Sequence, residues 1–269
     1  CAASHIRNMF QTSVLVSGSK GNSVLVRTGD TALLLDAGVA AKTIFAAMDA
    51  LRVPRESIQG IVVSHEHSDH IRGVGVVARA LKIPVFINED TYCYCSERLG
   101  KLPWEPVFFE TGQSFQIGDI IVHPFSSSHD AVDSCNFTFR RTEDEERRLG
   151  VATDLGYPTN LSIENLKLCT TLVLESNHDL QMLMNGPYEW HLKQRVKSRL
   201  GHLSNDQAVG LISNVMHHGL DNLVLAHLSE INNHPDLAIG AMRDYLSSLR
   251  RDLRLLVASQ YEHTPLIDV

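Results

Sequence analysis

The most constraining feature of this sequence is the segment Ser-His-Glu-His-Ser-Asp-His at residues 64–70. Four of its side chains belong to types that bind metal ions well. An apolar run at residues 60–63 precedes the segment and predicts a buried strand that ends where the segment begins. A helix is predicted to follow from Ile71 to Leu81. The segment is therefore expected at the edge of a sheet, where a site open to substrate can form.

The spacing of the four side chains predicts how they are shared between ions. In extended backbone, residues two apart point to the same side, so His65, His67 and Asp69 are expected to converge. His70 then turns to a neighbouring position at the start of the helix. Without a metal, burying this segment would crowd several polar groups together. One ion rarely takes four ligands from so short a loop and stays open to substrate, so two ions are predicted.

Length and composition predict one globular domain. The chain has 269 residues, of which 43% are apolar, and it contains no repeat, low-complexity linker or break in composition. The predicted domain spans residues 9–269. Residues 1–8 precede the first apolar strand pattern, which opens at Met9, and they are interpreted as an expression remnant or an alternative start. The net charge of −7 argues against bulk nucleic-acid binding, although metal ions can reverse the local sign at an active site.

The cysteines and the hydropathy pattern predict a cytoplasmic location. Five cysteines at scattered positions do not form a disulfide framework, and a reducing compartment fits them. Cys93 and Cys95 are interpreted as packing residues on a helix over 90–99, because no second cysteine pair accompanies them. No stretch approaches the length of a membrane span, and no secretory leader is recognisable. We expect no membrane association, and no stable protein partner is predicted.

Hydrophobic patterning predicts alternating strands and helices along the chain. Strands are expected at residues 10–17, 24–27, 32–35, 61–63, 85–87, 114–117, 119–124, 135–140, 149–153, 172–174, 223–226 and 253–258. Helices are expected at residues 41–51, 71–81, 90–99, a segment ending at 184, 188–200, 204–218 and 235–250. The dense run of mixed charge at residues 141–148 is interpreted as a solvated hairpin loop.

The pattern His-x-His-x-Asp-His resembles the signature of the metallo-β-lactamase superfamily. That resemblance implies an α/β (α+β) fold, a four-layer αββα sandwich, with a two-metal site at one edge of its sheets. In that superfamily, residues that match His65 and His67 hold one metal, and those that match Asp69 and His70 hold the other. A glutamate at the second histidine position is typical of the redox di-iron branch. His67 stands there in this chain, which favours hydrolysis.

Three further ligands are predicted at the ends of later strands, in keeping with this resemblance. His129 lies in a polar loop after a strand and is assigned as the third ligand of the first metal. Asp154 ends a strand and is assigned as a bridge, because a carboxylate can use both oxygens. His227, also at a strand end, is assigned as the last ligand of the second metal. The predicted cofactors are thus two divalent ions, which can be zinc, manganese or iron.

Several short stretches narrow the resemblance to the YycJ/WalJ-type bacterial metallo-hydrolases. They include Ser-Gly-Ser at 17–19, Ser-His-Asp-Ala at 128–131, Glu-Ser-Asn-His-Asp at 175–179, Gly-His-Leu-Ser-Asn at 201–205 and His-Leu-Ser at 227–229. Ser176 departs from the pattern, where a small residue such as alanine is expected. The resemblance covers residue 9 to the C-terminus and implies a 5′→3′ DNA exonuclease linked to DNA repair, with DNA as the partner.

Two small-residue segments are candidate contacts for a substrate phosphate. One segment is the turn that contains Ser17, Ser19 and Asn22, and the other is the helix start at Ser204 and Asn205. Turns rich in backbone N–H groups and helix N-termini both bind anions. The alternative is that the first segment is only a tight connection and that Ser204 only caps the following helix. The candidate phosphate contacts are Ser17, Ser19, Asn22, Ser204 and Asn205.

The predicted mechanism is attack on phosphorus by a hydroxide shared between two metals, which lie about 3.5–4 Å apart in such sites. Asp69, His178 and His202 are the candidate catalytic residues. The two histidines are candidate acids or phosphate contacts, and the alternative is that they orient metal ligands. A rival function is a small-molecule hydrolase, such as a thioesterase, lactonase or cyclic phosphodiesterase. A second rival is a metal-binding regulator without turnover.

Overall fold

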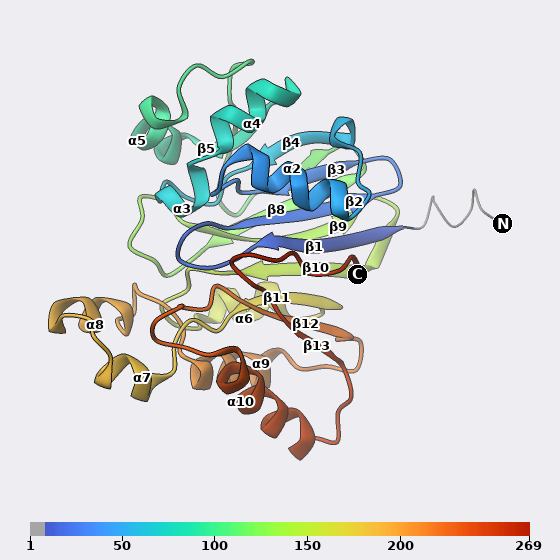
Figure 1. Cartoon of the computed structure of the whole chain (residues 1–269). Coiled ribbons are helices and arrows are strands. Elements are labelled where there is room, and N and C mark those ends of the chain that lie inside the picture. Colours follow the sequence, from blue (N-terminus) through green and yellow to red (C-terminus); the bar gives the residue numbers. More distant parts are fainter. Residues whose placement is uncertain (1–8) are drawn as a thin grey trace.

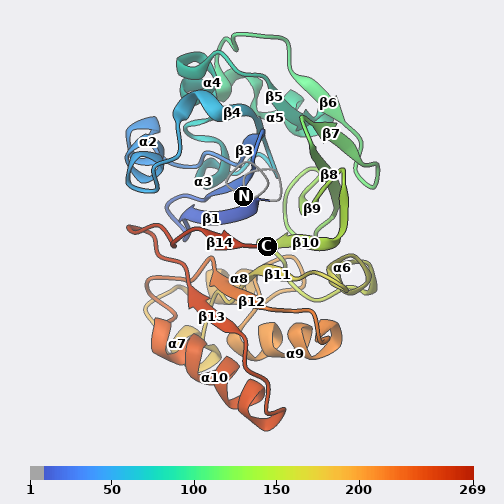
Figure 2. The same ribbon diagram turned by 90° about the vertical axis from the view of Figure 1, so that its right-hand side faces the viewer.

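The computed structural model describes residues 9–269, so the predicted remnant or alternative start at residues 1–8 lies outside the described residues. Two β-sheets pack face to face, and helices cover the outer face of each sheet (Figure 1). Figure 2 shows the helices of the first sheet in the upper part and those of the second sheet in the lower part, with the two sheets side by side between them. The predicted four-layer αββα sandwich is confirmed. Within residues 9–269, no helix has both the length and the apolar character of a membrane span.

The two sheets bring the ends of their parallel strands to one edge. The first sheet has the order β14 (Ile267–Asp268), β1 (Phe10–Val16), β2 (Ser23–Thr28), β3 (Ala32–Leu35), β4 (Ile58–Val62), β5 (Val85–Asn88) and β6 (Val107–Phe109). The second has the order β13 (Arg254–Val257), β12 (Asn222–Ala226), β11 (Thr171–Glu175), β10 (Asp144–Ala152), β9 (Cys135–Arg141), β8 (Ile120–Ser126) and β7 (Phe115–Ile117). Strands β3 to β6 are parallel, and so are β10 to β13. The loops that follow these strands therefore gather at the same edge.

The helices follow the same division. On the first half lie α2 (Ala41–Ala50), η1 (Arg55–Ser57), α3 (Ser68–Ile71), α4 (Val74–Leu81) and α5 (Glu89–Leu99). On the second half lie α6 (Asn160–Leu166), α7 (Leu180–Asn185), α8 (Trp190–Val196), α9 (Asn205–Val215) and α10 (Pro235–Ser248). One apolar layer lies between the sheets and includes Phe137 and Phe139. One further apolar layer lies between each sheet and the helices that cover it. Burying each such large side chain contributes about 1.5–3 kcal/mol.

The interpretation of residues 141–148 as a hairpin loop is wrong, because most of this run belongs to β9 and β10. The pairing of β9 with β10 shifts register between Asp144 and Arg148. Asp144 Oδ1 accepts hydrogen bonds from the backbone N–H of Glu146 (3.0 Å) and Arg147 (3.1 Å), which stabilises this irregular stretch. The charged side chains face water, so the outer end of the strand has the composition of a loop.

The helix predicted over residues 71–81 is also corrected, since it forms two helices that begin earlier and break at Gly73. The Gly73 N–H donates to the Ala37 carbonyl at 2.7 Å. A Cβ on Gly73 would lie 2.0 Å from the Val39 carbonyl oxygen, so no larger residue fits there. The other predicted elements are present with shifted ends, whereas the short elements β6, β14, η1 and α6 were not predicted.

The cysteines agree in part with their prediction. Cys95 is buried in the layer between the first sheet and its helices, as predicted for a packing residue. Cys93 is exposed, so the same prediction is wrong for it. The cysteines of the described residues, Cys93, Cys95, Cys135 and Cys169, are all free.

Candidate metal centre

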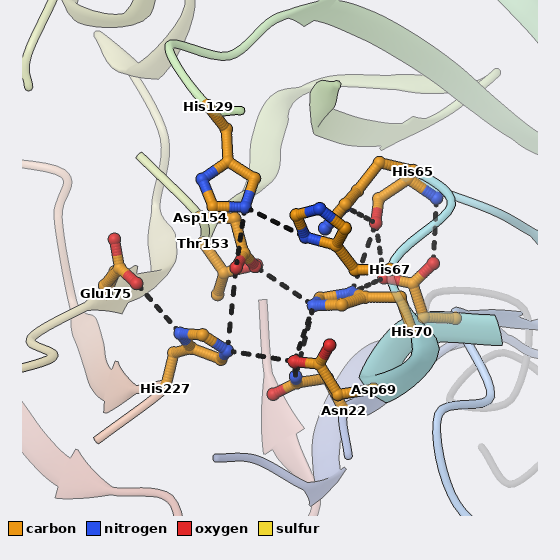
Figure 3. Close-up of polar contacts among 12 residues, drawn as sticks. Asn22, His65, His67, Asp69, His70, His129, Thr153, Asp154, Glu175 and His227 are labelled. Carbon is orange, nitrogen blue, oxygen red and sulfur yellow. Dashed lines mark hydrogen bonds and ion pairs between the residues drawn. The ribbon is translucent and has the colours of Figure 1, made fainter. Parts of the chain in front are cut away.

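Three of the seven non-glycine residues with positive φ in the described part of the chain lie at the sheet edge where the predicted ligands lie. Asp36 follows β3, Asp154 follows β10 and His227 follows β12, and each has a positive φ, of 59°, 54° and 55° respectively. This left-handed conformation costs a residue with a side chain about 1–2 kcal/mol. Such strain clusters at functional sites, where the surrounding structure holds it in place. At this edge, the side chains of Asp154 and His227 point into a common centre (Figure 3).

Potential ligands form four overlapping groups at this centre, and two of these groups, of three residues each, hold six of the seven predicted metal ligands. The donor atoms of the first group lie within 4.8 Å of one another, and the same limit holds for the second. We call these groups the first triad, which is His65, His67 and His129, and the second triad, which is Asp69, His70 and His227. In the first triad, His129 Nε2 lies 3.2 Å from His67 Nδ1. The extended part of the loop ends at His67, the residue before α3, so Asp69 joins His70 rather than His65 and His67.

Asp154 lies between the two triads. Its Oδ1 is 3.6 Å from His129 Nε2 and 3.6 Å from His227 Nε2, and its Oδ2 is 3.1 Å from His70 Nε2. Burial opposes the ionisation of Asp154, but the charges of His227 and His70 outweigh it and hold the pKa of this carboxyl well below its ordinary value. An ionised carboxylate between two groups of imidazoles is placed as a bridging ligand would be.

The histidines are fixed through their Nδ1 atoms. His70 donates Nδ1–H to Asp36 Oδ2 at 2.7 Å, and His227 donates Nδ1–H to Glu175 Oε1 at 2.8 Å. His129 donates Nδ1–H to the carbonyl of Gly201 at 3.1 Å. In a neutral imidazole the other nitrogen is then an acceptor. These three rings therefore direct Nε2 at the centre, as metal-binding histidines do. Burial opposes protonation of His70 and His227, but Asp154 outweighs it and raises the pKa of both rings, to about 10 for His227, so each binds a metal only after Nε2 has lost its proton.

Buried ring nitrogens without a hydrogen-bond partner indicate that this set of donor atoms fits divalent cations. Among the described residues, His65 Nε2 and His227 Nε2 are buried without a hydrogen-bond partner. A buried unpaired polar group costs about 1–3 kcal/mol, and a bound metal removes that cost. Burial also lowers the pKa of His65 well below its ordinary value, which keeps this ring neutral and able to bind a metal.

Two carboxylates that anchor the ligands were missed by the sequence analysis. Glu175 is fully buried, and its Oε1 accepts hydrogen bonds from both His202 and His227 at 2.8 Å. Asp36 accepts hydrogen bonds from the backbone N–H and the hydroxyl of Ser64 as well as from His70. Each lies at the end of a buried strand, so the criterion that identified Asp154 would have found them too.

The two candidate catalytic histidines lie in different surroundings. The side chain of His202 is 20% exposed, and its ring centroid is 5.2 Å from those of both His129 and His227. His178 is only 1% exposed and pairs through its backbone with Ser204. Burial lowers the pKa of His178 to about 4, so its ring is neutral near pH 7. Of the two, His202 is therefore the one with the position of a proton donor or phosphate contact.

Most candidate phosphate contacts are already hydrogen-bonded within the protein. Ser17 Oγ accepts the His227 N–H at 2.7 Å, and the Asn22 amide lies 3.3 Å from Asp69 Oδ2 and 3.2 Å from His70 Nε2. These contacts hold metal-ligand candidates in place. Ser204 caps α9, Asn205 is bonded to Ser176 and Asn233, and only Ser19 of the five candidates is exposed.

Comparison with known proteins identifies the family. The family model described as the metallo-beta-lactamase superfamily matches residues 16–153. The chain is 38% identical over 227 residues to exodeoxyribonuclease YycJ of Bacillus anthracis, covering 84% of this chain and 85% of that protein. The chain belongs to the metallo-β-lactamase superfamily. Exodeoxyribonuclease WalJ of Streptococcus pneumoniae is 34% identical to this superfamily member over 267 residues, covering 97% of the chain and 98% of that protein.

Solved structures agree with the metallo-β-lactamase fold. The metallo-beta-lactamase fold protein YhfI from Bacillus subtilis superposes with a TM-score of 0.70 at 16% identity, covering 95% of this chain and 99% of that one. Zn²⁺-bound PqqB from Methylobacterium extorquens superposes with a TM-score of 0.67 at 13% identity, covering 94% and 99%. These likenesses establish the fold alone. Membership of the superfamily, together with the two triads, indicates that the site binds divalent metal ions.

Proposed function

We propose that this chain is a metal-dependent exodeoxyribonuclease that degrades DNA in the 5′→3′ direction with two divalent ions. The observation that supports this proposal most directly is its 38% identity to an exodeoxyribonuclease over 84% of the chain. The gathering of both triads around Asp154 supports it independently, because a centre of two divalent ions is able to hydrolyse a phosphodiester. The link to DNA repair stays a prediction from the resemblance.

The proposed metal ligands follow the geometry of the site. The first triad would hold one ion and the second triad the other, with Asp154 reaching both. When bound, such ions polarise phosphoryl oxygens and lower the pKa of a water molecule. The protein itself supplies the fixed imidazole orientations, through Asp36 and Glu175, and a buried carboxylate that keeps its charge.

His202 is proposed to deliver a proton to the leaving oxygen or to contact the scissile phosphate. Its Nδ1–H is committed to Glu175, so its Nε2 is the atom that remains for the substrate. Nε2 can donate a proton only when the ring is protonated on both nitrogens, and in the neutral ring it is an acceptor. His202 belongs to neither triad, although it lies in another group of potential ligands with Asp154, Glu175 and His227. We expect His202→Ala to lose turnover while it keeps its metal, because both triads remain complete without it. A matched control is His218→Ala, which removes an exposed histidine at the end of α9. Loss of metal from His202→Ala would assign this residue to metal binding instead.

The decisive experiment uses 5′-phosphorylated duplex DNA labelled at one end or the other. Manganese-loaded and zinc-loaded protein are incubated with it beside an Asp69→Ala/His70→Ala variant. Stepwise release of mononucleotides from the 5′ end, absent in the variant, is the expected result and also identifies the active metal. Release from the 3′ end would reverse the polarity. Intact DNA together with hydrolysis of a small phosphodiester or thioester would overturn the DNA substrate.

A further inference from the structure

Two hollows share one wall, Tyr261, and the first of them is lined by Leu228, the residue after the ligand candidate His227. The first has a volume of about 340 Å³ and is lined by residues that follow β12 and β13, including Leu228. The second has a volume of about 510 Å³ and lies against α2, where Lys42 lines it. We propose that they form one groove, the Tyr261 groove, which binds the DNA strand next to the scissile phosphate and stacks a base on Tyr261. This inference rests on the proposed nuclease function.

The groove is joined to the metal centre through the turn at residues 17–22. Ser17 lines the first hollow, and its Oγ accepts the backbone N–H of His227, the residue before Leu228. Gln260 Nε2 donates to the carbonyl of Gly21 at 3.0 Å, which ties the segment that carries Tyr261 to the same turn. A strand whose phosphate lies at the second triad would therefore meet this groove within the next nucleotide or two.

Tyr261 has the properties of a stacking platform. Its side chain is 73% exposed, which is unusual for an aromatic residue that serves only packing. Its hydroxyl donates to Glu230 Oε1 and accepts a hydrogen bond from Lys20 Nζ at 3.0 Å, so the ring is held in one orientation. Because the ring is already fixed in place, stacking a base on it costs less side-chain conformational entropy. Stacking on one aromatic residue is commonly worth a factor of about five or more in affinity.

The groove is suited to DNA of any sequence. Two polar side chains of its first hollow are already engaged: Ser229 Oγ accepts the Asn232 N–H, and Asn233 is bonded to Ser176 and Asn205. These side chains do not read base edges, and the apolar walls contact any base alike. Lys42 is exposed at the far hollow and supplies a positive charge for a phosphate in an otherwise acidic chain. We therefore expect homopolymers of different bases to bind with similar affinity.

The first test measures stacking without turnover. Metal-loaded protein is mixed with 5′-phosphorylated single strands whose phosphorothioate linkages resist cleavage and which carry 2-aminopurine at nucleotide 2 or at nucleotide 12. We expect quenching of the base at nucleotide 2 only, and roughly tenfold weaker binding by Tyr261→Ala. Tyr261→Phe keeps the ring and should keep the quenching. Tyr94→Ala, which removes another exposed tyrosine (69%) on α5, is the matched control.

The second test separates the groove from the nuclease function. On cleavable DNA, Tyr261→Ala should raise KM roughly tenfold and leave kcat within about twofold. Lys42→Gln should reduce the slope of log affinity against log salt concentration by about one, whereas Lys101→Gln should leave this slope unchanged. Equal KM and equal quenching in Tyr261→Ala and the unaltered chain would overturn the groove while the nuclease function stands. No DNA cleavage by the unaltered chain with any metal would overturn the nuclease function itself.

Discussion

At the scale of single residues, the metal centre depends on which ring nitrogen of each histidine is free. Asp36, Glu175 and the Gly201 carbonyl accept the Nδ1–H of His70, His227 and His129 respectively. The Nε2 atom of each ring therefore points to the centre. Without these partners an imidazole could rotate or adopt the other tautomer, and ligand geometry would be lost. The anchoring residues are therefore expected to influence metal affinity almost as strongly as the ligands.

Asp36→Asn isolates this effect. Asparagine tolerates the left-handed backbone that Asp36 adopts, so the substitution removes the carboxylate charge with little change in strain. We expect metal affinity to fall by roughly 10- to 100-fold, because His70 loses its charged partner. Competition with a chelator measures the affinity, and Asp30→Asn in an exposed turn is the control. Unchanged affinity would mean that His70 is oriented by its other contacts.

Glu175→Gln is expected to impair two functions together. Glu175 Oε1 accepts hydrogen bonds from both His202 and His227, so an amide there disturbs a metal-ligand candidate and the proposed proton donor at once. Metal affinity and kcat should both fall by about tenfold or more. Metal titration and steady-state kinetics measure the two effects, with the exposed Glu164→Gln as the control. A fall in kcat with full metal affinity would restrict the role of Glu175 to His202.

The contrast between predicted and missed residues has a physical explanation. The histidines and Asp69 in the segment at 64–70 were found because four good ligands lie close in sequence. Asp36 and Glu175 also stand at strand ends, but their partners His70 and His227 are distant in sequence, so the strand-end position marks them as candidates without assigning the histidine that each one holds. Asn22 was predicted as a phosphate contact, and the structure instead places its amide beside Asp69 and His70. Composition identifies a polar turn but not the partner that uses it.

At the scale of elements, close packing of two loops sets the position of α3 and hence of the second triad. A Cβ on Gly38 would lie 1.6 Å from the carbonyl oxygen of Asp69. The sequence predicted a helix from Ile71, and the earlier start at Ser68 could not be deduced, because it depends on the loop at residues 36–39 packing against it. The same limit applies to β10, whose charged outer end is a strand only because β9 pairs with it.

Gly38→Ala tests this packing. The added methyl group must displace the turn that holds Asp69 and His70, so we expect a loss of stability of about 1–3 kcal/mol and weaker binding at the second triad. Chemical denaturation and metal titration measure these two effects. Gly240→Ala in α10 is the opposite control: its Cβ would have no neighbour within 4 Å, and it should stabilise the protein by about 0.5–1 kcal/mol. Equal stability of both variants would contradict the packing argument.

At the scale of the whole molecule, each triad joins the two sheets. His65 and His67 follow β4 of the first sheet, whereas His129 follows β8 of the second. The second triad repeats this arrangement with a pair of ligands from α3 and His227 after β12. A metal ion in either triad therefore links the two halves of the sandwich, and it is expected to bind the folded chain far better than the unfolded one.

Removal of metal should consequently lower the melting temperature of the whole chain. At a free metal concentration of 100 times Kd, binding contributes about 2.7 kcal/mol. That figure is for one ion, and for a chain of this size it corresponds to a shift of roughly 5–10 °C between chelator and metal, so two ions should give about twice this shift, which calorimetry or circular dichroism measures. His129→Ala/His227→Ala removes the second-sheet member of each triad, so its melting temperature should no longer respond to metal. The exposed pair His191→Ala/His218→Ala should respond like the unaltered chain. If the first double variant keeps the full shift, the loop at 64–70 and Asp154 hold the ions without the two histidines of the second sheet.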